Sequence, residues 1–375
     1  MEHKVLLVEN NRIMLERLSS VIRAKPDFEL IMRCQKPQDA LRQGRVFETS
    51  LVLLDIEPEE NRAMLPEFVR TFPHAAIVGL GNRWEAARSR EVIEAGAQGC
   101  MTKPFTADDL TNLTETLQHG SSVRDAEVLT FFSPKGKSGK TTLIANLAMS
   151  LARKSGESVG IIDADLQFGD MAVFFNLQPK STIAEVVRDV RFLSPYTLRS
   201  YFVPVTERVN VLCGTARPDY AELVQPKDFH TIVDMARTLF RYVLLDIAPG
   251  FGPIQIESAE LSEHTFLVAM INDGFEIQHM KRALEIFKDW EDYEDRVHAL
   301  FTRVSPCDSA SQQNLSHALG YPVEAVLPNE YMLVSNAANN GRMAVDIKPT
   351  SPLTHNIDKL VDRLRGRKRI RWDKP

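Results

Sequence analysis

Residues 131–142 read Phe131-Phe132-Ser133-Pro134-Lys135-Gly136-Lys137-Ser138-Gly139-Lys140-Thr141-Thr142. An apolar run, residues 128–132, leads into this stretch, and residues 143–149 follow it with apolar side chains at helical spacing. The pattern predicts a strand, a tight turn and a helix. Backbone N–H groups in such a turn converge on an anion at the helix N-terminus. We therefore predict a nucleotide site here.

The turn contains the side chains that phosphate and metal binding require. Lys140 is placed to reach the β- and γ-phosphates of ATP, and Thr141 is placed to ligate Mg²⁺. A basic surface turn that happens to contain Gly-Lys-Thr-Thr is the alternative, and the flanking strand and helix argue against it. The residues expected to bind the nucleotide are Gly136, Lys137, Ser138, Gly139, Lys140, Thr141 and Thr142.

The loop departs from the standard P-loop, because Pro134 stands at the first glycine position and Lys135 follows it. It resembles the deviant Walker A motif of the ParA/MinD family, Lys-Gly-Gly-x-Gly-Lys-Thr-Thr, with Lys137 in place of the second glycine. The resemblance implies an ATPase that forms a homodimer around two nucleotides, in which Lys135 reaches the partner's nucleotide. A side chain at Lys137 is unfavourable if the position needs a positive φ, although it adds charge near the phosphates.

Two later strands end in carboxylates. Residues 158–162 are largely apolar and lead into Asp163-Ala164-Asp165, and residues 242–245 lead into Asp246. In a nucleotidase such carboxylates orient the attacking water and hold water around Mg²⁺. By resemblance, Asp165 matches the first switch region, with Asp163 supporting the strand end, and Asp246 matches the Walker B acid. An acidic turn and a buried strand with a capping Asp are the alternatives.

Five short apolar runs alternate with helical patterns between residues 4 and 118. Five β/α units in about 120 residues predict a doubly wound parallel sheet. The predicted strands are residues 5–8, 30–32, 51–54, 76–80 and 99–101.

Ligands of such sheets bind beyond the carboxyl ends of the strands, where Glu9, Asn10, Asp55 and Lys103 fall. These positions resemble the active site of a response-regulator receiver domain, with Asp55 as phosphoacceptor. Asn10 replaces a Mg²⁺-ligating carboxylate and Gly81 replaces a Thr or Ser, which weakens metal binding and removes the switch contact. We therefore expect a pseudo-receiver. Phosphorylation of Asp55 is one alternative, and a solvated strand-end acid with Lys103 as its ion-pair partner is another.

The remaining pattern of the second half is less specific. A helix is predicted at 183–187, a strand at 209–213, ordered loops at 195–196 and 202–204, and a helix at 228–240. Strands are predicted at 265–270 and 297–301, with an amphipathic helix, 276–290, between them. Thr302 stands just after the second of these strands, where family members carry an Asn that reads adenine. We expect weaker base selection by about 1 kcal/mol.

The run Leu166-Gln167-Phe168-Gly169-Asp170 is similar to the CpaE/TadZ branch of the superfamily, ATPases that position tight-adherence (Flp-type) pilus machinery. The resemblance implies partners among pilus or secretion assembly proteins. It also implies a cytoplasmic protein, peripheral at the inner membrane or a cell pole.

Composition agrees with a globular protein, since 44% of the 375 residues are hydrophobic. A net charge of −5 and a pI near 6.0 argue against a general nucleic-acid-coating surface. Four scattered cysteines without a Cys-x-x-Cys pair favour a reduced, cytoplasmic protein. No signal peptide or spanning segment is predicted.

We therefore expect an α/β protein with two doubly wound domains, a flavodoxin-like receiver-type domain and a P-loop NTPase domain. Their predicted extents are residues 1–120 and 128–365, with a linker at 121–127 and a basic tail at 366–375. The tail is expected to contact anionic lipid or nucleic acid, or to be simply solvated. The expected catalytic residues are Lys135, Lys140, Asp165 and Asp246, with ATP and Mg²⁺ as cofactors. A DNA-partition ATPase and a nucleotide-binding scaffold without turnover are the rival functions, and DNA binding is disfavoured by the acidic body.

Overall fold

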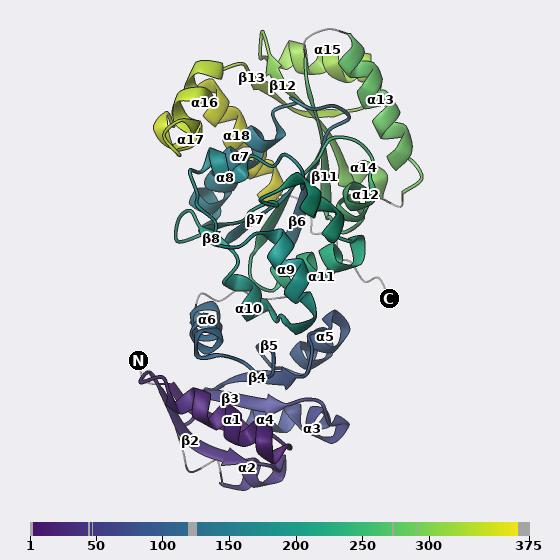
Figure 1. The fold of residues 1–375 in the computed structure, drawn as a ribbon. Helices are drawn as coiled ribbons and strands as arrows, with labels where there is room; N and C mark the ends of the chain where they lie inside the picture. The colour runs from purple at the N-terminus through teal and green to yellow at the C-terminus, as the bar shows by residue number, and fades with distance from the viewer. Residues whose placement is uncertain are drawn as a thin grey trace. The chain divides into compact units, whose positions relative to one another are not determined.

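A computed structural model describes residues 3–43, 46, 48–118, 126–271, 274–290 and 292–366. The chain folds into two compact units (Figure 1). The first comprises Met1–Ser121 together with Asp189–Ser200, and the second comprises Ser122–Arg188 with Tyr201–Pro375. Most of the predicted linker and all but the first residue of the predicted basic tail lie outside the described residues.

The first unit contains a five-stranded parallel sheet in the order β2-β1-β3-β4-β5. This is the flavodoxin-like order predicted from the sequence, and it confirms the fold class. The strands are β1 (His3–Val8), β2 (Phe28–Cys34), β3 (Leu51–Asp55), β4 (Ala76–Gly81) and β5 (Gly99–Thr102).

Helices cover both faces of this sheet (Figure 1). Because successive strand residues point to opposite faces, Val5 and Leu7 of β1 join one hydrophobic cluster and Leu6 and Val8 join the other. The helices are α1 (Arg12–Arg23), α2 (Pro37–Gln43), α3 (Glu59–Ala63), α4 (Leu65–Thr71), α5 (Ala86–Glu94) and α6 (Ala107–Gln118).

The second unit contains an eight-stranded sheet in the order β13-β12-β11-β6-β10-β7-β9-β8. All neighbouring pairs are parallel except β8 with β9. The central strands are mostly apolar and buried at all but one residue, as expected for a parallel sheet covered on both faces. The strands are β6 (Glu127–Phe132), β7 (Val159–Ala164), β8 (Val203–Pro204), β9 (Val209–Leu212), β10 (Tyr242–Ile247), β11 (His264–Met270), β12 (Val297–Val304) and β13 (Val323–Pro328).

Helix α7 (Lys140–Ser155) follows the phosphate loop, and ten of its 16 residues are buried. The last long helix, α18 (Pro352–Gly366), packs against it, and Lys154 of α7 pairs with Asp362 at 2.6 Å. The other helices of this unit are α8 (Met171–Phe174), α9 (Ile183–Asp189), η3 (Pro218–Leu223), α11 (Pro226–Arg237), α12 (Pro253–Glu260), α13 (Phe275–Phe287), α14 (Tyr293–Arg296), α15 (Ser309–Leu319), α16 (Tyr331–Ala338) and α17 (Ala344–Ile347).

Three details of the sequence prediction were wrong. The loops expected at 195–196 and 202–204 form a short helix, α10 (Pro195–Arg199), and the edge strand β8. Thr302 lies within β12, which continues to Val304 through an irregularity in its pairing with β13. Helix α13 ends at Phe287, short of the predicted residue 290. Tertiary pairing decides each of these boundaries, and local sequence does not contain it.

None of the helices in the described part of the chain combines the length and the apolar character that a membrane span requires.

Candidate functional site

The phosphate loop joins β6 to α7 through two residues with positive φ. Gly139, the residue before α7, has φ 82°, and Lys137 has φ 64°. The position that the sequence analysis identified as unfavourable for a side chain therefore does adopt the left-handed conformation. A non-glycine residue there costs roughly 1 kcal/mol. The Lys137 side chain is exposed, so its charge is available to a ligand at the loop.

The backbone of the loop is held to the segment that follows β10. Gly250 N–H donates to the carbonyl of Ser133 at 3.1 Å, and the Ser133 hydroxyl donates to the carbonyl of Lys135. A Cβ at Gly136 would lie 3.8 Å from Pro249. These contacts order the loop while leaving the Lys135 side chain exposed to solvent.

At the first turn of α7, the Thr141 hydroxyl donates to Asp246 Oδ2 at 2.7 Å. The two residues are neighbours because β10, which contains Asp246, pairs in parallel with β6. Asp246 is 1% exposed, and burial raises the pKa of its carboxyl group to about 6, against the opposing effects of Lys140 and the Thr141 hydrogen bond. A threonine hydroxyl beside a buried carboxylate is the donor set that P-loop proteins use around Mg²⁺.

The ammonium group of Lys140 and the nearby carboxylates provide the charges that bind a triphosphate and a metal ion. Lys140 is 7% exposed, and burial lowers the pKa of its ammonium group, an effect opposed by the carboxylates of Asp246, Asp165 and Asp163. The Ser138 hydroxyl is buried without a hydrogen-bond partner among the described residues. No group of three or more His, Cys, Asp or Glu side chains within the described ranges is arranged to hold a metal by itself. Mg²⁺ here would therefore use Thr141, water and nucleotide phosphates, as its coordination preferences favour.

Asp163 and Asp165 differ sharply in environment. Asp163 is buried, and its two carboxylate oxygens accept from Asp165 N–H at 3.3 Å and Met171 N–H at 3.1 Å. Burial, with the nearby Asp246 charge, raises the pKa of Asp163 well above its ordinary value. Asp165 is only partly buried, and it accepts from Phe168 N–H at 3.3 Å. Asp163 therefore holds the loop, and Asp165 stays accessible at the strand end.

The loop after β7 needs a glycine at position 169. A Cβ there would lie 2.4 Å from both carboxylate oxygens of Asp163, too close for any side chain without a shift. The glycine in the run Leu166-Gln167-Phe168-Gly169-Asp170 thus has a local cause, because the backbone passes directly over the buried carboxylate.

The Thr302 hydroxyl donates to the carbonyl of Ser138 at 2.7 Å, which ties β12 to the phosphate loop. This hydroxyl is therefore already committed to the protein backbone. Beside it lies an open, mostly apolar pocket that also includes Thr142 from the predicted nucleotide-binding set. The pocket is lined by Gly139, Thr142, Leu143, Thr302, Arg303, Leu327, Pro328, Asn329, Glu330, Tyr331, Val334, Leu353 and Ile357.

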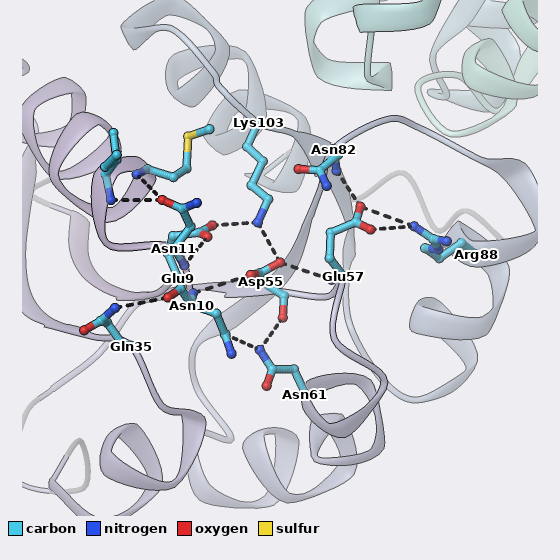
Figure 2. Close-up of polar contacts among 12 residues, drawn as sticks. Glu9, Asn10, Asn11, Gln35, Asp55, Glu57, Asn61, Asn82, Arg88 and Lys103 are labelled. Carbon is cyan, nitrogen blue, oxygen red and sulfur yellow. Dashed lines mark hydrogen bonds and ion pairs between the residues drawn. The ribbon is translucent and has the colours of Figure 1, made fainter.

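In the first unit, the Lys103 ammonium group bridges two buried carboxylates (Figure 2). Lys103 Nζ lies 2.7 Å from Glu9 Oε2 and 2.7 Å from Asp55 Oδ1. The three residues are 8%, 0% and 3% exposed, respectively. Burial raises the pKa of Glu9, and the contact with Lys103 opposes that rise. Asp55 is thus a buried, paired carboxylate, in contrast to a solvated strand-end acid.

Asn10 contributes to this site through its amide and backbone. Its N–H donates to Asp55 Oδ2 at 3.4 Å, and its side-chain oxygen accepts from the amide of Asn61 at 2.8 Å (Figure 2). The same Asn61 amide nitrogen also lies 2.8 Å from the carbonyl of Asp55. Asn61, which is 1% exposed, was not predicted as a site residue, because a single amide on a short helix belongs to no sequence motif.

A second interaction missed from the sequence holds the loop after β4. Glu57 accepts from Asn82 N–H at 2.6 Å and pairs with Arg88 at 3.3 Å (Figure 2). Gly81 lies against this pair, since a Cβ there would be 3.1 Å from Arg83 O and 3.5 Å from Glu57 Oε1. A Thr or Ser at Gly81 would therefore crowd the loop. The Glu57 carboxylate lies close to the position at which the resemblance to a receiver would place that hydroxyl.

Comparison with known families assigns both units. Residues 129–345 match the family described as CobQ/CobB/MinD/ParA nucleotide binding domain, and residues 5–115 match the response regulator receiver domain.

Individual relatives agree with the larger match. The septum site-determining protein MinD of Thermotoga maritima is 23% identical over 252 residues, covering 64% of this chain and 88% of the relative. A ParA family ATPase from Chlorobium tepidum superposes with a TM-score of 0.59 at 16% identity, covering 64% of this chain and 99% of that one. MinD from Pyrococcus horikoshii, solved with Mg-ADP, gives 0.55 at 19% identity, covering 64% and 96%. These structural likenesses establish the fold.

Proposed function

The chain belongs to the CobQ/CobB/MinD/ParA nucleotide-binding family, and we propose that it is a Mg²⁺-dependent ATPase whose ATP-bound form is a homodimer. One observation carries this proposal. The Thr141 hydroxyl and the buried Asp246 carboxylate are in contact at 2.7 Å, beside the buried Lys140 ammonium group. Lys140 supplies positive charge for the β- and γ-phosphates, and the Thr141–Asp246 pair supplies the protein side of a Mg²⁺ site.

The remaining residues support turnover and dimer formation. Asp165 stands at the carboxyl end of β7, partly exposed, where it is able to orient a water molecule. Lys135 is exposed on the loop, and it forms no ion pair with another residue in the described part of the chain. It is therefore available to a nucleotide held by a second copy. Hydrolysis is slow and times the life of the dimer.

The output of the ATP-bound dimer is the localisation or licensing of tight-adherence pilus or secretion machinery. The similarity of the run Leu166-Gln167-Phe168-Gly169-Asp170 to the CpaE/TadZ branch supports this role. The Phe168 side chain is 74% exposed beside Asp165, so a partner protein is able to read the state of this loop directly. The protein acts in the cytoplasm, at the inner surface of the membrane or at a cell pole.

The receiver-like unit is a pseudo-receiver in this proposal. Asp55 is buried and bonded to Lys103, Glu57 N–H and Asn10 N–H, and the side chain of Asn10 is bonded to Asn61. The Asn10 side chain, bonded to Asn61, supplies an amide where a receiver supplies a Mg²⁺-ligating carboxylate. Beryllofluoride bound at Asp55 in the presence of Mg²⁺ would contradict this assignment.

A nucleotide-binding scaffold without turnover is the rival function; Lys137 in the phosphate loop and Thr302 keep it open, and the intact pair Asp165 and Asp246 argues against it. Phosphate release under single-turnover conditions separates the two. Wild-type release that disappears in Asp165→Ala supports the ATPase, whereas no release from either protein supports the scaffold.

The dimer is tested by light-scattering mass with ATP, with ADP and without nucleotide. We expect the wild type to double its mass with ATP alone. Lys135→Ala is expected to bind ATP and to remain a monomer, while Lys180→Ala, at an exposed lysine outside the phosphate loop, serves as the control. A wild-type mass that does not change with ATP, or a Lys135→Ala protein that dimerises normally, would contradict the proposed role of Lys135.

A further inference from the structure

The segment Asp189–Ser200 lies in the second half of the sequence but belongs to the first unit. It contains the short helices η2 (Val190–Phe192) and α10 (Pro195–Arg199), and Ser194 caps α10 by accepting from Thr197 N–H at 3.3 Å. Helix α10 packs on α6 and β5 (Figure 1). The receiver-like sheet is therefore covered on one side by chain from outside the receiver-like sequence.

Tyr196 is the anchor of this segment. It is 5% exposed and belongs to the hydrophobic cluster of the first unit that contains Met101, Leu110 and Leu113. Leu198 is fully buried as well. Burial of this aromatic and aliphatic surface is the main favourable contribution expected for the contact.

Gly99 admits the Tyr196 ring. A Cβ at Gly99 would lie 2.0 Å from the Tyr196 hydroxyl oxygen, 3.2 Å from Cζ and 3.6 Å from Cε2. The first distance is impossible for two non-bonded atoms. The second is a tight contact that a shift of a few tenths of an ångström would relieve, and the third is an ordinary van der Waals contact. Glycine at position 99, the first residue of β5, thus leaves the space that the Tyr196 hydroxyl oxygen occupies.

Polar contacts add direction to the packing. The Thr102 hydroxyl at the end of β5 donates to the carbonyl of Phe192 at 3.0 Å. Arg199 is partly buried and is attracted by the Glu115 carboxylate on α6. The Phe192 side chain itself is 76% exposed, so the contact at this residue is made through its backbone.

The chain on both sides of the segment is anchored in the second unit. Before it, Ile183 N–H donates to the carbonyl of Cys213 at 3.0 Å. After it, the Phe202 ring is 5% exposed and lies 4.8 Å from the Phe240 ring, measured between centroids. The chain therefore contributes one buried aromatic residue to each unit within six positions, Tyr196 and Phe202.

We propose that Asp189–Ser200 is an intramolecular docking element whose binding site is the β5–α6 face of the receiver-like unit. The two units are then joined by a second connection, independent of the residues between α6 and β6. This second connection is non-covalent, and Tyr196 is its main contact. The chain enters the segment from Arg188 and leaves it at Tyr201, and both of these residues belong to the second unit. This proposal does not depend on nucleotide hydrolysis or on the identity of the partner proteins.

Cutting the covalent connection in the full-length protein tests this proposal. Residues 120–125 are replaced by a site for a specific protease, the folded protein is cleaved, and the two pieces are separated by size exclusion. We expect the N-terminal piece to co-elute with the C-terminal piece. Separation of the wild-type pieces at micromolar concentration would overturn the proposal.

Variants at the Gly99–Tyr196 contact make the test specific. Gly99→Ala is expected to release the N-terminal piece after cleavage, with affinity reduced by about a hundredfold or more. Tyr196→Phe alone is expected to keep the pieces together. Gly99→Ala combined with Tyr196→Phe is expected to restore co-elution, because the atom at 2.0 Å is then absent.

Phe192→Ala is the matched control, since it removes an exposed aromatic from the same segment and is expected to leave co-elution unchanged. Circular dichroism before cleavage shows whether each variant is folded. If Gly99→Ala does not fold, Tyr196→Ala tests the same contact from the other side. Co-elution that survives Gly99→Ala or Tyr196→Ala in a folded protein, or a double variant that fails to restore it, would refute the role of Tyr196.

Discussion

The hydroxyl of Thr141 donates a hydrogen bond to the carboxylate of Asp246 over 2.7 Å, between residues 105 positions apart in the chain. The contact exists because β6, which leads to the phosphate loop, pairs directly with β10. It brings the start of α7 and the end of a buried strand into the arrangement that a metal-bound triphosphate requires.

Loss of the Thr141 hydroxyl is expected to remove the Mg²⁺ dependence of nucleotide binding. Thr141→Ala should weaken ATP binding in the presence of Mg²⁺ by at least about tenfold, since it removes the side-chain oxygen placed to ligate the metal ion. Titration calorimetry with and without Mg²⁺ measures the effect. Thr141→Ser keeps the hydroxyl and is expected to bind like the wild type, and equal loss in both variants would contradict the role of this oxygen.

The pKa of Asp246 predicts a pH dependence for the nucleotide-free protein. Because the folded-state pKa, about 6, lies above the ordinary value of 3.8, folding favours the protonated form. Stability from this group is therefore highest below pH 3.8, falls as the pH rises toward 6, and stays low above it.

Asp246→Asn removes that ionisation while keeping an acceptor for the Thr141 hydroxyl. We expect the variant to melt several degrees higher than the wild type at pH 7.5, with a smaller difference at pH 5. Thermal denaturation without nucleotide or metal measures both. A variant less stable than the wild type at pH 7.5 would be evidence against the burial penalty.

A glycine at position 137 is expected to relieve the backbone. Lys137→Gly should leave the free energy of unfolding unchanged or raise it by up to about 1 kcal/mol, because glycine adopts positive φ without penalty. Lys135→Gly, in the same exposed loop without a positive φ, should lower it by roughly 0.5–1 kcal/mol. Urea denaturation of both proteins compares the two positions, and equal losses would show that the φ of Lys137 stores no strain.

The stability of the receiver-like unit is expected to depend on Lys103, the cation that pairs with both Glu9 and Asp55. Lys103→Met leaves Glu9 and Asp55 as two unpaired buried carboxylates, which should destabilise this unit by about 3–5 kcal/mol. Lys4→Met removes an exposed pair with Glu48 and should change stability by less than about 1 kcal/mol.

Chemical denaturation of both variants, with and without Mg²⁺, separates a pseudo-receiver from a metal-binding receiver. We expect Mg²⁺ to leave the stability of Lys103→Met unchanged, because the Asn10 side chain supplies an amide where a receiver supplies a carboxylate. Full rescue by Mg²⁺ would show that the carboxylates form a competent metal site.

Thr302 is expected to contribute little to the choice of base. Its hydroxyl is bonded to Ser138 O, so the wild type should bind ATP and GTP with affinities within about tenfold of each other. Thr302→Val should weaken the binding of both nucleotides by a similar factor. It removes the hydrogen bond to the Ser138 carbonyl of the phosphate loop, which contributes about 1 kcal/mol. Competition binding with the two nucleotides measures the ratio, and a strong ATP preference would require an adenine contact elsewhere in the pocket.

The sequence by itself determined the five strands of the first sheet and six of the eight strands of the second, all but β8 and β13. Alternation of apolar runs with helical patterns predicts parallel strands, and strands such as Leu51–Asp55 are buried throughout because helices cover both sides. The strand–loop–helix around Lys140 and Thr141 is equally local, since one turn contains the glycine, the lysine and the hydroxyl in order. Polar residues directly after strands, Asp55 and Asp165 among them, were identifiable because parallel strands end at one edge.

Only the tertiary structure decided the contacts between residues far apart in sequence. Tyr196 packs over Gly99, and Glu57 holds Asn82 and Arg88, through side-chain complementarity that leaves no periodic pattern in the chain. The same reason explains Thr302, whose hydroxyl bonds to Ser138 only because β12 extends past its predicted end. A propensity acts over a few neighbouring residues, whereas the position of a backbone carbonyl beside a distant hydroxyl follows from packing of the whole unit.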